Sequence, residues 1–314
     1  MHTRPRERKT VFRSGEISLN EINPKVMLVD GMALLFRGYY ANAYGGYIRK
    51  TKAGLPTNAV FGFVRYLLDA CRTFGPSHIV CCWDMGSKTF RTEKFDAYKG
   101  NRPEAPADLI PQFDLVKEVV SGLSIPNVGI SGYEADDCIG TLSKQFGRHM
   151  DVYVLTGDHD MLQLVDERVK VVIMKKGPSN YAVYDKEKLL EEKQLTPQQF
   201  IDLKGLIGDT SDNYPGVKGI GEKTATKLLI EYGSIDGILE NLHLLPKGVK
   251  AKIEADVEML HLCRELATIY CEAPVACSVE DSHWRPDRAQ IATLFEELEF
   301  NSLVKEVGKL IEVS

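Results

Sequence analysis

The segment GYEADDCIGTLSKQFGRHMDVYVLTGDHD, from Gly132 to Asp160, holds acidic side chains in two groups around a helix and a strand. Apolar residues recur between the groups with the spacing of one helix face, at positions 135, 139, 142 and 146, and Gly147 can end that helix. Residues 151–156 are rich in Val, Tyr and Leu and predict a short strand. The first acidic group therefore begins a helix and the second follows a strand, so the two groups can face one another.

A single acid at any of these places has an ordinary explanation. Carboxylates at the start of a helix complement its dipole, and aspartate commonly caps a helix. Carboxylates in two tight groups repel one another, however, unless some are neutral or cations lie between them. We therefore expect a divalent metal site to which this segment contributes Glu134, Asp136, Asp137, Asp158 and Asp160.

The pattern of a buried strand followed by an aspartate occurs twice more. Residues 26–29 precede Asp30, and residues 78–83 precede Asp84. Helical stretches such as residues 59–74 separate these strands, which predicts a parallel sheet with right-handed crossovers. Ligands bind beyond the carboxyl ends of such strands, so we expect the aspartates along one edge, although turn chemistry explains each of them alone.

Composition predicts a globular protein of one large domain or two, because 44% of the 314 residues are hydrophobic and 26% are charged. The formal charge of −5 argues against a polyanionic partner only if it is spread evenly, and it is not if many acids lie in one site. The seven cysteines form no CxxC pair and favour a reducing cytoplasm. No membrane-spanning run or signal peptide is expected, and residues 1–24 are expected to be a disordered tail.

Residues 88–102 alternate basic and aromatic side chains and are followed by Pro103 and Pro106. This mixture suits single-stranded nucleic acid, because cations contact phosphates while aromatic faces accept bases of any sequence. A solvated surface helix is the alternative interpretation.

Two further strands are predicted at residues 169–174 and 181–184, and the chain then becomes helical to residue 310. A capping box at residues 196–199 begins a helix that Gly208 ends. The turn after it holds Asp209 and Asp212, which could reach the same site. The glycines of residues 216–224 allow backbone N–H groups to approach a phosphate, although the segment lacks a Walker pattern and a plain helical corner is the alternative.

Seven motifs follow one another along the chain: LVDG ending at Gly31, CWD ending at Asp84, YKGNR of residues 98–102, GYEADD, TGDHD, GDTSDN of residues 208–213 and the hairpin of residues 216–224. In this order they resemble the motifs of the 5′ nuclease, or flap endonuclease, family. The chain is most similar in pattern to stand-alone relatives of the 5′ to 3′ exonuclease domain of bacterial DNA polymerase I. The resemblance covers about residues 25 to 311. It implies an α/β fold with a PIN-like core and a mostly parallel sheet in residues 25–190. It also implies a helical arch at about residues 86–110, and a helical region with a helix-hairpin-helix element in residues 191–314.

The resemblance also implies roles for individual residues. One metal site would use Asp30, Asp84, Glu134 and Asp136. The other would use Asp158, Asp160, Asp209 and Asp212, with Asp137 alongside. The scissile phosphate or the 5′ strand would be contacted by Arg37, Arg91, Lys99 and Arg102. DNA would be bound by Tyr98 and, in the hairpin, by Gly216, Lys218, Gly219, Gly221, Lys223 and Thr224, with a potassium ion at the hairpin.

These observations predict a metal-dependent 5′ to 3′ exonuclease and 5′ flap endonuclease of DNA replication and repair. An all-carboxylate site favours two Mg2+ or Mn2+ ions over Zn2+, and two such ions suit phosphodiester hydrolysis. DNA with a 5′ end or 5′ flap is the expected partner of a monomeric, cytoplasmic, nucleoid-associated protein. The alternatives are a non-catalytic DNA-binding module with an inert acidic cluster and a small-molecule phosphatase.

Overall fold

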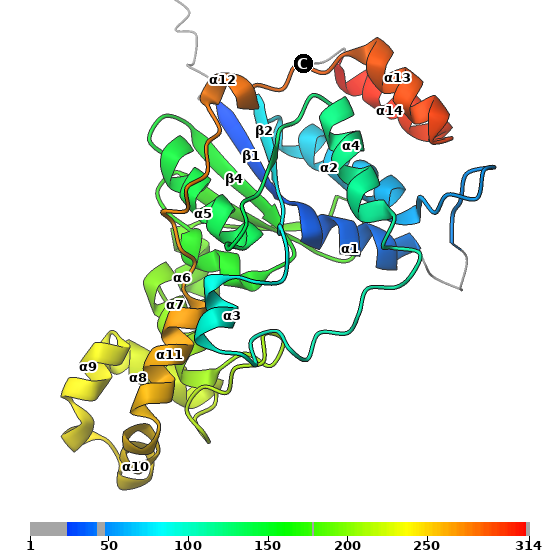
Figure 1. The fold of residues 1–314 in the computed structure, drawn as a ribbon. Helices are drawn as coiled ribbons and strands as arrows, with labels where there is room; N and C mark the ends of the chain where they lie inside the picture. Colours follow the sequence, from blue (N-terminus) through cyan, green and yellow to red (C-terminus); the bar gives the residue numbers. More distant parts are fainter. Residues whose placement is uncertain (1–23, 43–47, 178, 312–314) are drawn as a thin grey trace, which may run out of the picture.

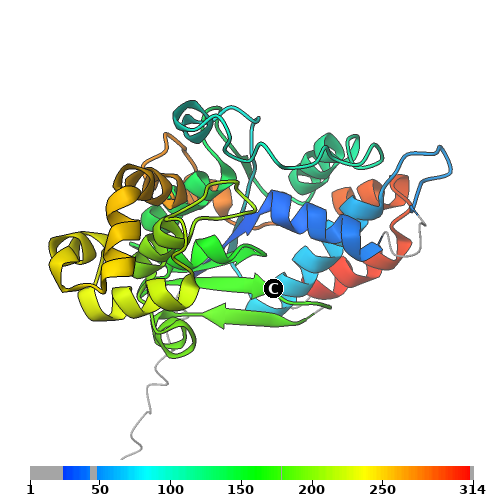
Figure 2. The ribbon, with the colours of Figure 1, turned by 90° about the horizontal axis from the view of Figure 1, so that it is seen from below.

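The computed structural model describes residues 24–42, 48–177 and 179–311. The tail predicted to be disordered therefore lies outside the described residues, apart from Pro24. A six-stranded sheet forms the centre of the molecule, with the strand order β3-β2-β1-β4-β5-β6 (Figures 1 and 2). Its strands are β1 (Lys25–Asp30), β2 (His78–Cys82), β3 (Asn127–Val128), β4 (Asp151–Thr156), β5 (Val169–Met174) and β6 (Tyr181–Tyr184). All neighbouring pairs are parallel except β5 and β6.

Helices cover both faces of the sheet and extend beyond one end of it. In the first half of the chain they are α1 (Gly31–Asn42), α2 (Asn58–Phe74), α3 (Phe90–Lys94), α4 (Gln112–Gly122), α5 (Ala135–Phe146) and the 3-10 helix η2 (His159–Leu164). The next are α6 (Lys186–Lys193), α7 (Pro197–Ile207), α8 (Glu222–Tyr232), α9 (Ile235–Glu240) and the 3-10 helix η3 (Leu242–Leu244). The last are α10 (Lys247–Ala255), α11 (Val257–Ala267), α12 (Val279–Ser282), α13 (Arg288–Glu297) and α14 (Asn301–Ile311).

Alternation along β1 divides the core into two layers. Met27 and Val29 face a cluster that includes residues of α1, α2, α4, α13 and α14, whereas Val26 and Leu28 face α5 on the other side. Successive strand residues point to opposite faces, and both faces of a central parallel strand are covered, so the whole run is apolar. The predicted α/β fold with a mostly parallel sheet is confirmed. The short strand β3 was not predicted, because two residues are too few to show the alternation of polar and apolar side chains that marks a strand.

The segment expected to form a helical arch is mostly irregular. Between β2 and α4 it contains one short helix, α3, followed by turns. Lys99 adopts a φ of 55°, and Pro103 and Pro106 lack the N–H that a continuing helix needs. The segment still crosses from α3 to α4 in front of the sheet edge (Figure 1).

The C-terminal part of the chain returns to the sheet. Residues 268–278 contain no helix, contrary to the expectation of a helical pattern to residue 310, and they run along α5. Their backbone bonds to that helix, because Tyr270 N donates to Asp137 Oδ1 and Ala273 N donates to Thr141 Oγ1. Helices α13 and α14 then pack on α4 and α2. The boundary at residue 191 stays a prediction, and the last two helices belong to the core of the sheet.

A third hydrophobic cluster lies in the helices beyond the sheet and includes residues of α7, α8, α9, α10 and α11. The hairpin of residues 216–224 connects α7 to α8 within this cluster. No helix in the described parts of the chain is long and apolar enough to cross a membrane.

Candidate active site

Three aspartates lie where the parallel strands end. Asp30 is the last residue of β1 and pairs in register with Cys82 of β2, while Asp84 and Asp158 lie two residues beyond β2 and β4. Hydrogen bonds fix two of these side chains. Asp30 accepts hydrogen bonds from Ala33 N and the Thr156 hydroxyl at 2.9 and 2.7 Å, and Asp84 accepts one of 2.8 Å from Ala135 N at the start of α5. The predicted edge of carboxylates is thus formed by the sheet register.

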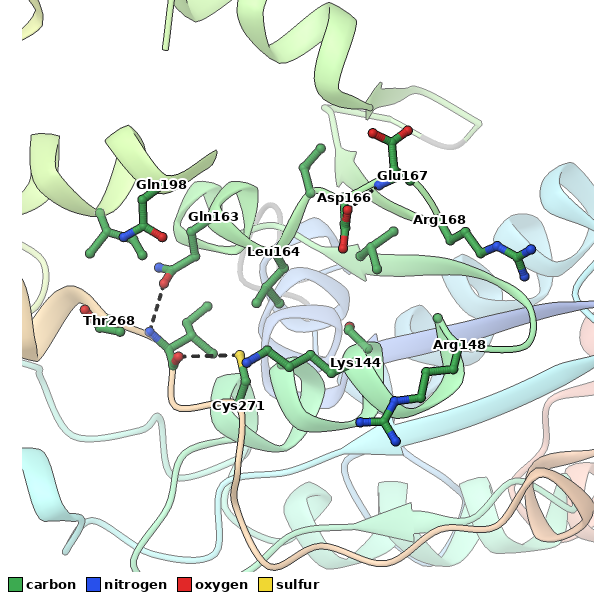
Figure 3. Close-up of a pocket in the computed structure, with 17 residues that line it drawn as sticks. Lys144, Arg148, Gln163, Leu164, Asp166, Glu167, Arg168, Gln198, Thr268 and Cys271 are labelled. Atoms are coloured by element: carbon green, nitrogen blue, oxygen red, sulfur yellow. Dashed lines mark hydrogen bonds between the residues drawn. The ribbon is translucent and has the colours of Figure 1, made fainter. Parts of the chain in front are cut away.

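A cavity of about 470 Å³ opens at this edge. The carboxylates that line it are Asp30, Asp84, Asp136, Asp158, Asp160 and Asp209, and the cations are Lys99, Arg102 and Lys204. A second cavity of about 800 Å³ beside α5 contains none of the predicted metal ligands (Figure 3). The acidic cavity therefore brings together most of the residues that the sequence assigned to one site.

The carboxylates in the cavity raise one another's pKa. Burial raises the pKa of Asp30 to about 6, and the charges of Asp84 and Asp158 add to this rise. Burial also raises the pKa of Asp136 well above its usual range, with a further contribution from Asp158. The pKa of Asp160 rises to about 6 for the same two reasons, although Lys204 opposes the rise. The site therefore carries more negative charge than its own cations neutralise, which is an environment that attracts cations.

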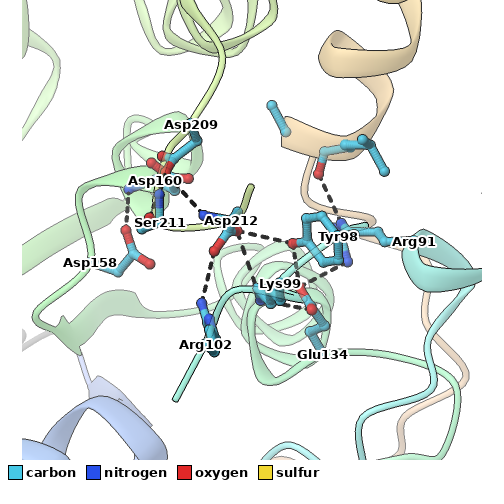
Figure 4. Close-up of polar contacts among 12 residues, drawn as sticks. Arg91, Tyr98, Lys99, Arg102, Glu134, Asp158, Asp160, Asp209, Ser211 and Asp212 are labelled. Carbon is cyan, nitrogen blue, oxygen red and sulfur yellow. Dashed lines mark hydrogen bonds and ion pairs between the residues drawn. The ribbon is translucent and has the colours of Figure 1, made fainter. Parts of the chain in front are cut away.

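Lys99 and Arg102 meet the carboxylates from the segment between α3 and α4 (Figure 4). Lys99 Nζ lies 2.7 Å from Glu134 Oε1, and Arg102 Nη2 lies 2.8 Å from Asp212 Oδ1. The Tyr98 hydroxyl lies 3.2 Å from Glu134 and 3.1 Å from Asp212. Glu134 and Asp212 therefore lie behind these side chains and do not line the cavity, so they are bound to the segment as the structure stands.

Lys204 was missed by the sequence reasoning. It projects from α7, and its ammonium group lies 2.6 Å from Asp160 and also pairs with Asp209. Burial raises the pKa of Asp209, but the hydrogen bonds from Lys204 and Ser211 outweigh it and lower that pKa to about 2. The available signal was a lysine within the helix that precedes Asp209, five residues before it.

Arg91 and Asp137 form a buried ion pair away from the cavity, and this argues against their predicted roles. The guanidinium binds both Asp137 oxygens at 2.8 Å, and the exposed fractions of the two side chains are 3% and 0%. Arg91 also donates to Leu266 O and Thr268 O, while Asp137 accepts from Tyr270 N. Figure 4 shows Arg91 on the far side of Tyr98 and Glu134 from the aspartates. We therefore revise both from DNA and metal contacts to structural residues that attach α3 and α5 to the chain after α11.

Arg37 also lies outside the acidic cavity. Its Nη1 donates to Met174 O at 3.2 Å, and its guanidinium lies 5.1 Å from the centre of the Tyr66 ring. This position at the end of β5 gives no support to the predicted contact with the scissile phosphate.

The hairpin between α7 and α8 has the predicted glycine geometry. Gly216 and Gly219 have φ values of 65° and 80°, which other residues rarely adopt. A Cβ on Gly216 would lie 2.2 Å from Gly208 N, so the turn also requires close packing of the backbone. Lys218 and Lys223 are exposed, whereas Thr224 is partly covered. The hairpin therefore presents glycine backbone and two lysines to the surface.

The residues of the site fit divalent cations in chemistry. All the acidic donors are carboxylates, which hard cations such as Mg2+ and Mn2+ prefer. No three His, Cys, Asp or Glu side chains among the described residues lie close enough together to hold one ion as they stand. Lys99, Arg102 and Lys204 pair with Glu134, Asp212, Asp160 and Asp209, whereas Asp30, Asp84 and Asp136 have no ion pair among the described residues.

Comparison with family models gives a match over most of the chain. Residues 25–194 match the model described as the N-terminal resolvase-like domain of 5′-3′ exonuclease, and residues 195–290 match its C-terminal SAM fold. The chain belongs to the 5′-3′ exonuclease family. This confirms the predicted resemblance, and the protein is a nuclease by membership.

The chain is similar in sequence to two kinds of relative. A protein of Bacillus subtilis named 5′-3′ exonuclease is 50% identical over 92% of this chain and 97% of its own length. DNA polymerase I of Lactococcus lactis is 41% identical over 88% of this chain, and the match spans 32% of the polymerase. This nuclease chain therefore matches one relative throughout and about a third of the polymerase.

Solved structures share the fold. The T5 5′-exonuclease with bound zinc has a TM-score of 0.65 at 24% identity and covers 87% of this chain and 98% of its own. Flap endonuclease-1 of Methanococcus jannaschii has a TM-score of 0.60 at 18% identity, with 92% of both chains covered. At these sequence identities the two comparisons establish a shared fold only.

Proposed function

We propose that this nuclease is a divalent-metal-dependent 5′ to 3′ exonuclease and 5′ flap endonuclease that acts on DNA in replication and repair. The observation that carries the proposal is the cavity in which six carboxylates at the sheet edge share a lining with Lys99 and Arg102. Acids alone would repel a phosphodiester, whereas acids with bound cations and two basic side chains can hold one.

The names of relatives support this function. The Bacillus subtilis relative is named a 5′-3′ exonuclease, and a structural neighbour is a flap endonuclease. The T5 enzyme has been solved with DNA and metal ions, and the catalytic core of Rad2 with a DNA substrate. These are properties of those proteins, and they agree with the chemistry of this cavity.

We assign the metal ligands from the lining of the cavity. Asp30, Asp84 and Asp136 would hold one ion, and Asp158, Asp160 and Asp209 the other, with Glu134 and Asp212 available if Lys99 and Arg102 release them. Two such ions, when bound, activate water and stabilise the charge of the leaving oxygen.

The chain's own cations would position the substrate. Lys99 and Arg102 bind carboxylates as the structure stands, and a phosphate oxygen is an equally good acceptor for both. Arg102 is 52% exposed, so it can turn toward an arriving 5′ strand without loss of packing. A metal ion that binds Glu134 or Asp212 would release Lys99 or Arg102 for the phosphate. Movement of Lys99 or Arg102 to the phosphate would in turn free these carboxylates for the metal, so the two events would favour each other.

The helical region would bind the duplex next to the cleavage site. Glycine backbone and the exposed Lys218 and Lys223 of the hairpin suit contacts with the DNA backbone, which carry no sequence information. A potassium ion at this hairpin and action as a monomer are further parts of the proposal.

A 5′-labelled flap substrate tests the proposal with the purified protein in Mg2+ and in excess EDTA. We expect cleavage with the metal and none with the chelator. Asp136→Asn should leave a folded protein that binds the flap and scarcely cleaves it, because a small displacement of an ion costs orders of magnitude in rate. Asp114→Asn, on an exposed acid of α4, serves as the matched control.

Near-parental cleavage by the Asp136 variant would show that the acidic cavity is not the catalytic centre. An inert cluster on a DNA-binding module would then explain the protein better. Cleavage of a small phosphate ester, with no cleavage of the flap, would instead favour the phosphatase.

A further inference from the structure

A groove runs along α5 on the other side of Arg91 from the acidic cavity. It is made of two cavities of about 520 and 800 Å³. The two share Lys144, Thr268, Ile269 and Cys271 in their walls, so they lie side by side. We call this combined channel the Tyr270 groove. The active site described above uses none of the residues that line it.

One end of the Tyr270 groove is a platform of three aromatic rings. Tyr133 and Tyr270 are stacked with their centres 5.8 Å apart and an angle of 22° between the rings. Phe90 packs against both, at 6.0 and 6.2 Å. Tyr270 is nevertheless 41% exposed, so part of this platform stays open to a ligand. A planar ligand could extend the existing stack.

The other end of the groove is basic (Figure 3). Lys144, Arg148 and Arg168 form no ion pair with any acid in the described parts of the chain. Four acids also line the groove: Asp166 and Glu167 share Lys186 at 3.3 and 3.0 Å, Glu265 pairs with Lys94, and Glu272 has no ion pair among the described residues. Lys144, Arg148 and Arg168 are thus available to an anionic ligand at the end of the groove away from Glu272.

A buried polar group in the wall also lacks a partner. Ser143 lines the wider cavity and is 2% exposed, and its Oγ has no hydrogen-bond partner among the described residues. A buried hydroxyl without a partner is unusual in a folded protein, and a buried water molecule commonly supplies the missing bond.

The groove begins one residue away from the active site at two places in the sequence. Phe90 and Tyr133 line the groove, whereas the next residues, Arg91 and Glu134, form the wall behind the acidic cavity. The acidic cavity and the aromatic platform are therefore neighbours along the chain on either side of Arg91 and Glu134.

We propose that the Tyr270 groove binds the unpaired 5′ flap of the DNA, with a base on the Tyr270 platform and phosphates along Lys144, Arg148 and Arg168. The inference rests on the proposed nuclease function and extends it to the path of the single strand. Aromatic faces combined with a row of cations are the features that hold single strands without regard to sequence. A mononucleotide would use one phosphate contact, and an acidic peptide would leave the platform without a stacking partner.

The test compares a duplex that carries a long oligothymidine 5′ flap with a nicked duplex that has no flap, by fluorescence anisotropy in EDTA so that neither is cleaved. The variants are Tyr270→Leu, its conservative partner Tyr270→Phe, and Arg148→Ala combined with Arg168→Ala. The matched control is Lys305→Ala with Lys309→Ala, which removes two exposed cations of α14. Melting curves verify that each variant is folded.

Loss of the stacked base should weaken flap binding of Tyr270→Leu about tenfold, and Tyr270→Phe should bind like the parent. The double arginine variant should flatten the dependence of log affinity on log salt by about 1.4, since each single-strand phosphate contact contributes about 0.7. Both variants should bind the nicked duplex unchanged. In the parent, 5-iodouracil in the flap should crosslink to Tyr270.

Equal losses on both substrates, parental flap binding by both variants, or crosslinks to other residues only would overturn the proposal. The proposal would also be overturned if a free mononucleotide or an acidic peptide displaced the flap substrate from the parent protein and oligothymidine did not. A parent protein that binds neither substrate in EDTA and cleaves neither in Mg2+ would instead refute the nuclease function, so the two failures are distinguishable.

Discussion

Replacing Arg91 by methionine tests whether this residue holds the fold or contacts DNA. In the structure its guanidinium makes two bonds of 2.8 Å to Asp137, and both side chains are at most 3% exposed. Removal of one partner of such a pair leaves a buried charge without compensation, which costs about 3–5 kcal/mol. At roughly 2 °C per kcal/mol for a chain of this size, the melting temperature should fall by about 6–10 °C.

The assay measures thermal unfolding of Arg91→Met, Asp137→Leu and the double variant, with single-turnover cleavage of a flap substrate beside it. The double variant should regain part of the loss, because it removes the uncompensated charge along with the pair. Arg285→Met is the matched control. Its partner Glu280 is 75% exposed and Arg285 itself 67%, so that variant should change stability by less than about 1 kcal/mol.

A parental melting temperature together with a large loss of cleavage by Arg91→Met would refute the structural assignment. It would restore the contact with the 5′ strand that the sequence predicted. A double variant that is less stable than either single variant would show that the two residues do not act as a pair.

Four further outcomes are expected. Lys99→Ala should slow single-turnover flap cleavage by about 10²–10³ if the ammonium group binds the phosphate as proposed, and it should lower the melting temperature less than Arg91→Met does, because Glu134 keeps Arg91 as a partner; a parental rate would contradict this. Lys218→Ala with Lys223→Ala should weaken duplex binding equally for all sequences, and a sequence-dependent loss in titrations would argue against a backbone clamp. Asp30 and Asp160 have pKa values raised to about 6, so without metal their contribution to stability is full below about pH 4 and is lost as the pH rises to 6. Because ions need the deprotonated carboxylates, the rise in melting temperature with Mn2+ should be larger at pH 7 than at pH 5, and an equal rise would speak against these ligands.

Much of the fold follows from periodicity in the sequence. The runs that precede Asp30, Asp84 and Asp158 are continuous and apolar because central parallel strands are buried on both faces, and this signal also places the aspartates at one edge. The helix after Glu134 was equally predictable, since its apolar face and Gly147 mark its course.

The side-chain partners within the site could not be predicted in the same way. Sequence spacing puts Asp136 and Asp137 together at a helix start, but only the packing of α3 and the chain after α11 decides that Asp137 binds Arg91 while Asp136 faces the cavity. Lys204 comes from a distant helix whose approach to the sheet depends on the whole helical region. Such choices depend on tertiary contacts that no local pattern records.

The folded core of the chain extends beyond the match to the family model, because the last two helices, α13 and α14, pack on the sheet layer. The family match ends at residue 290, yet Phe295, Phe300 and Leu303 are fully buried against the sheet layer. A protein shortened at the end of the match would keep every residue of the acidic cavity and would expose the apolar side of α2 to water. Self-association through that uncovered side would then remove the nuclease from solution while its chemistry stayed intact.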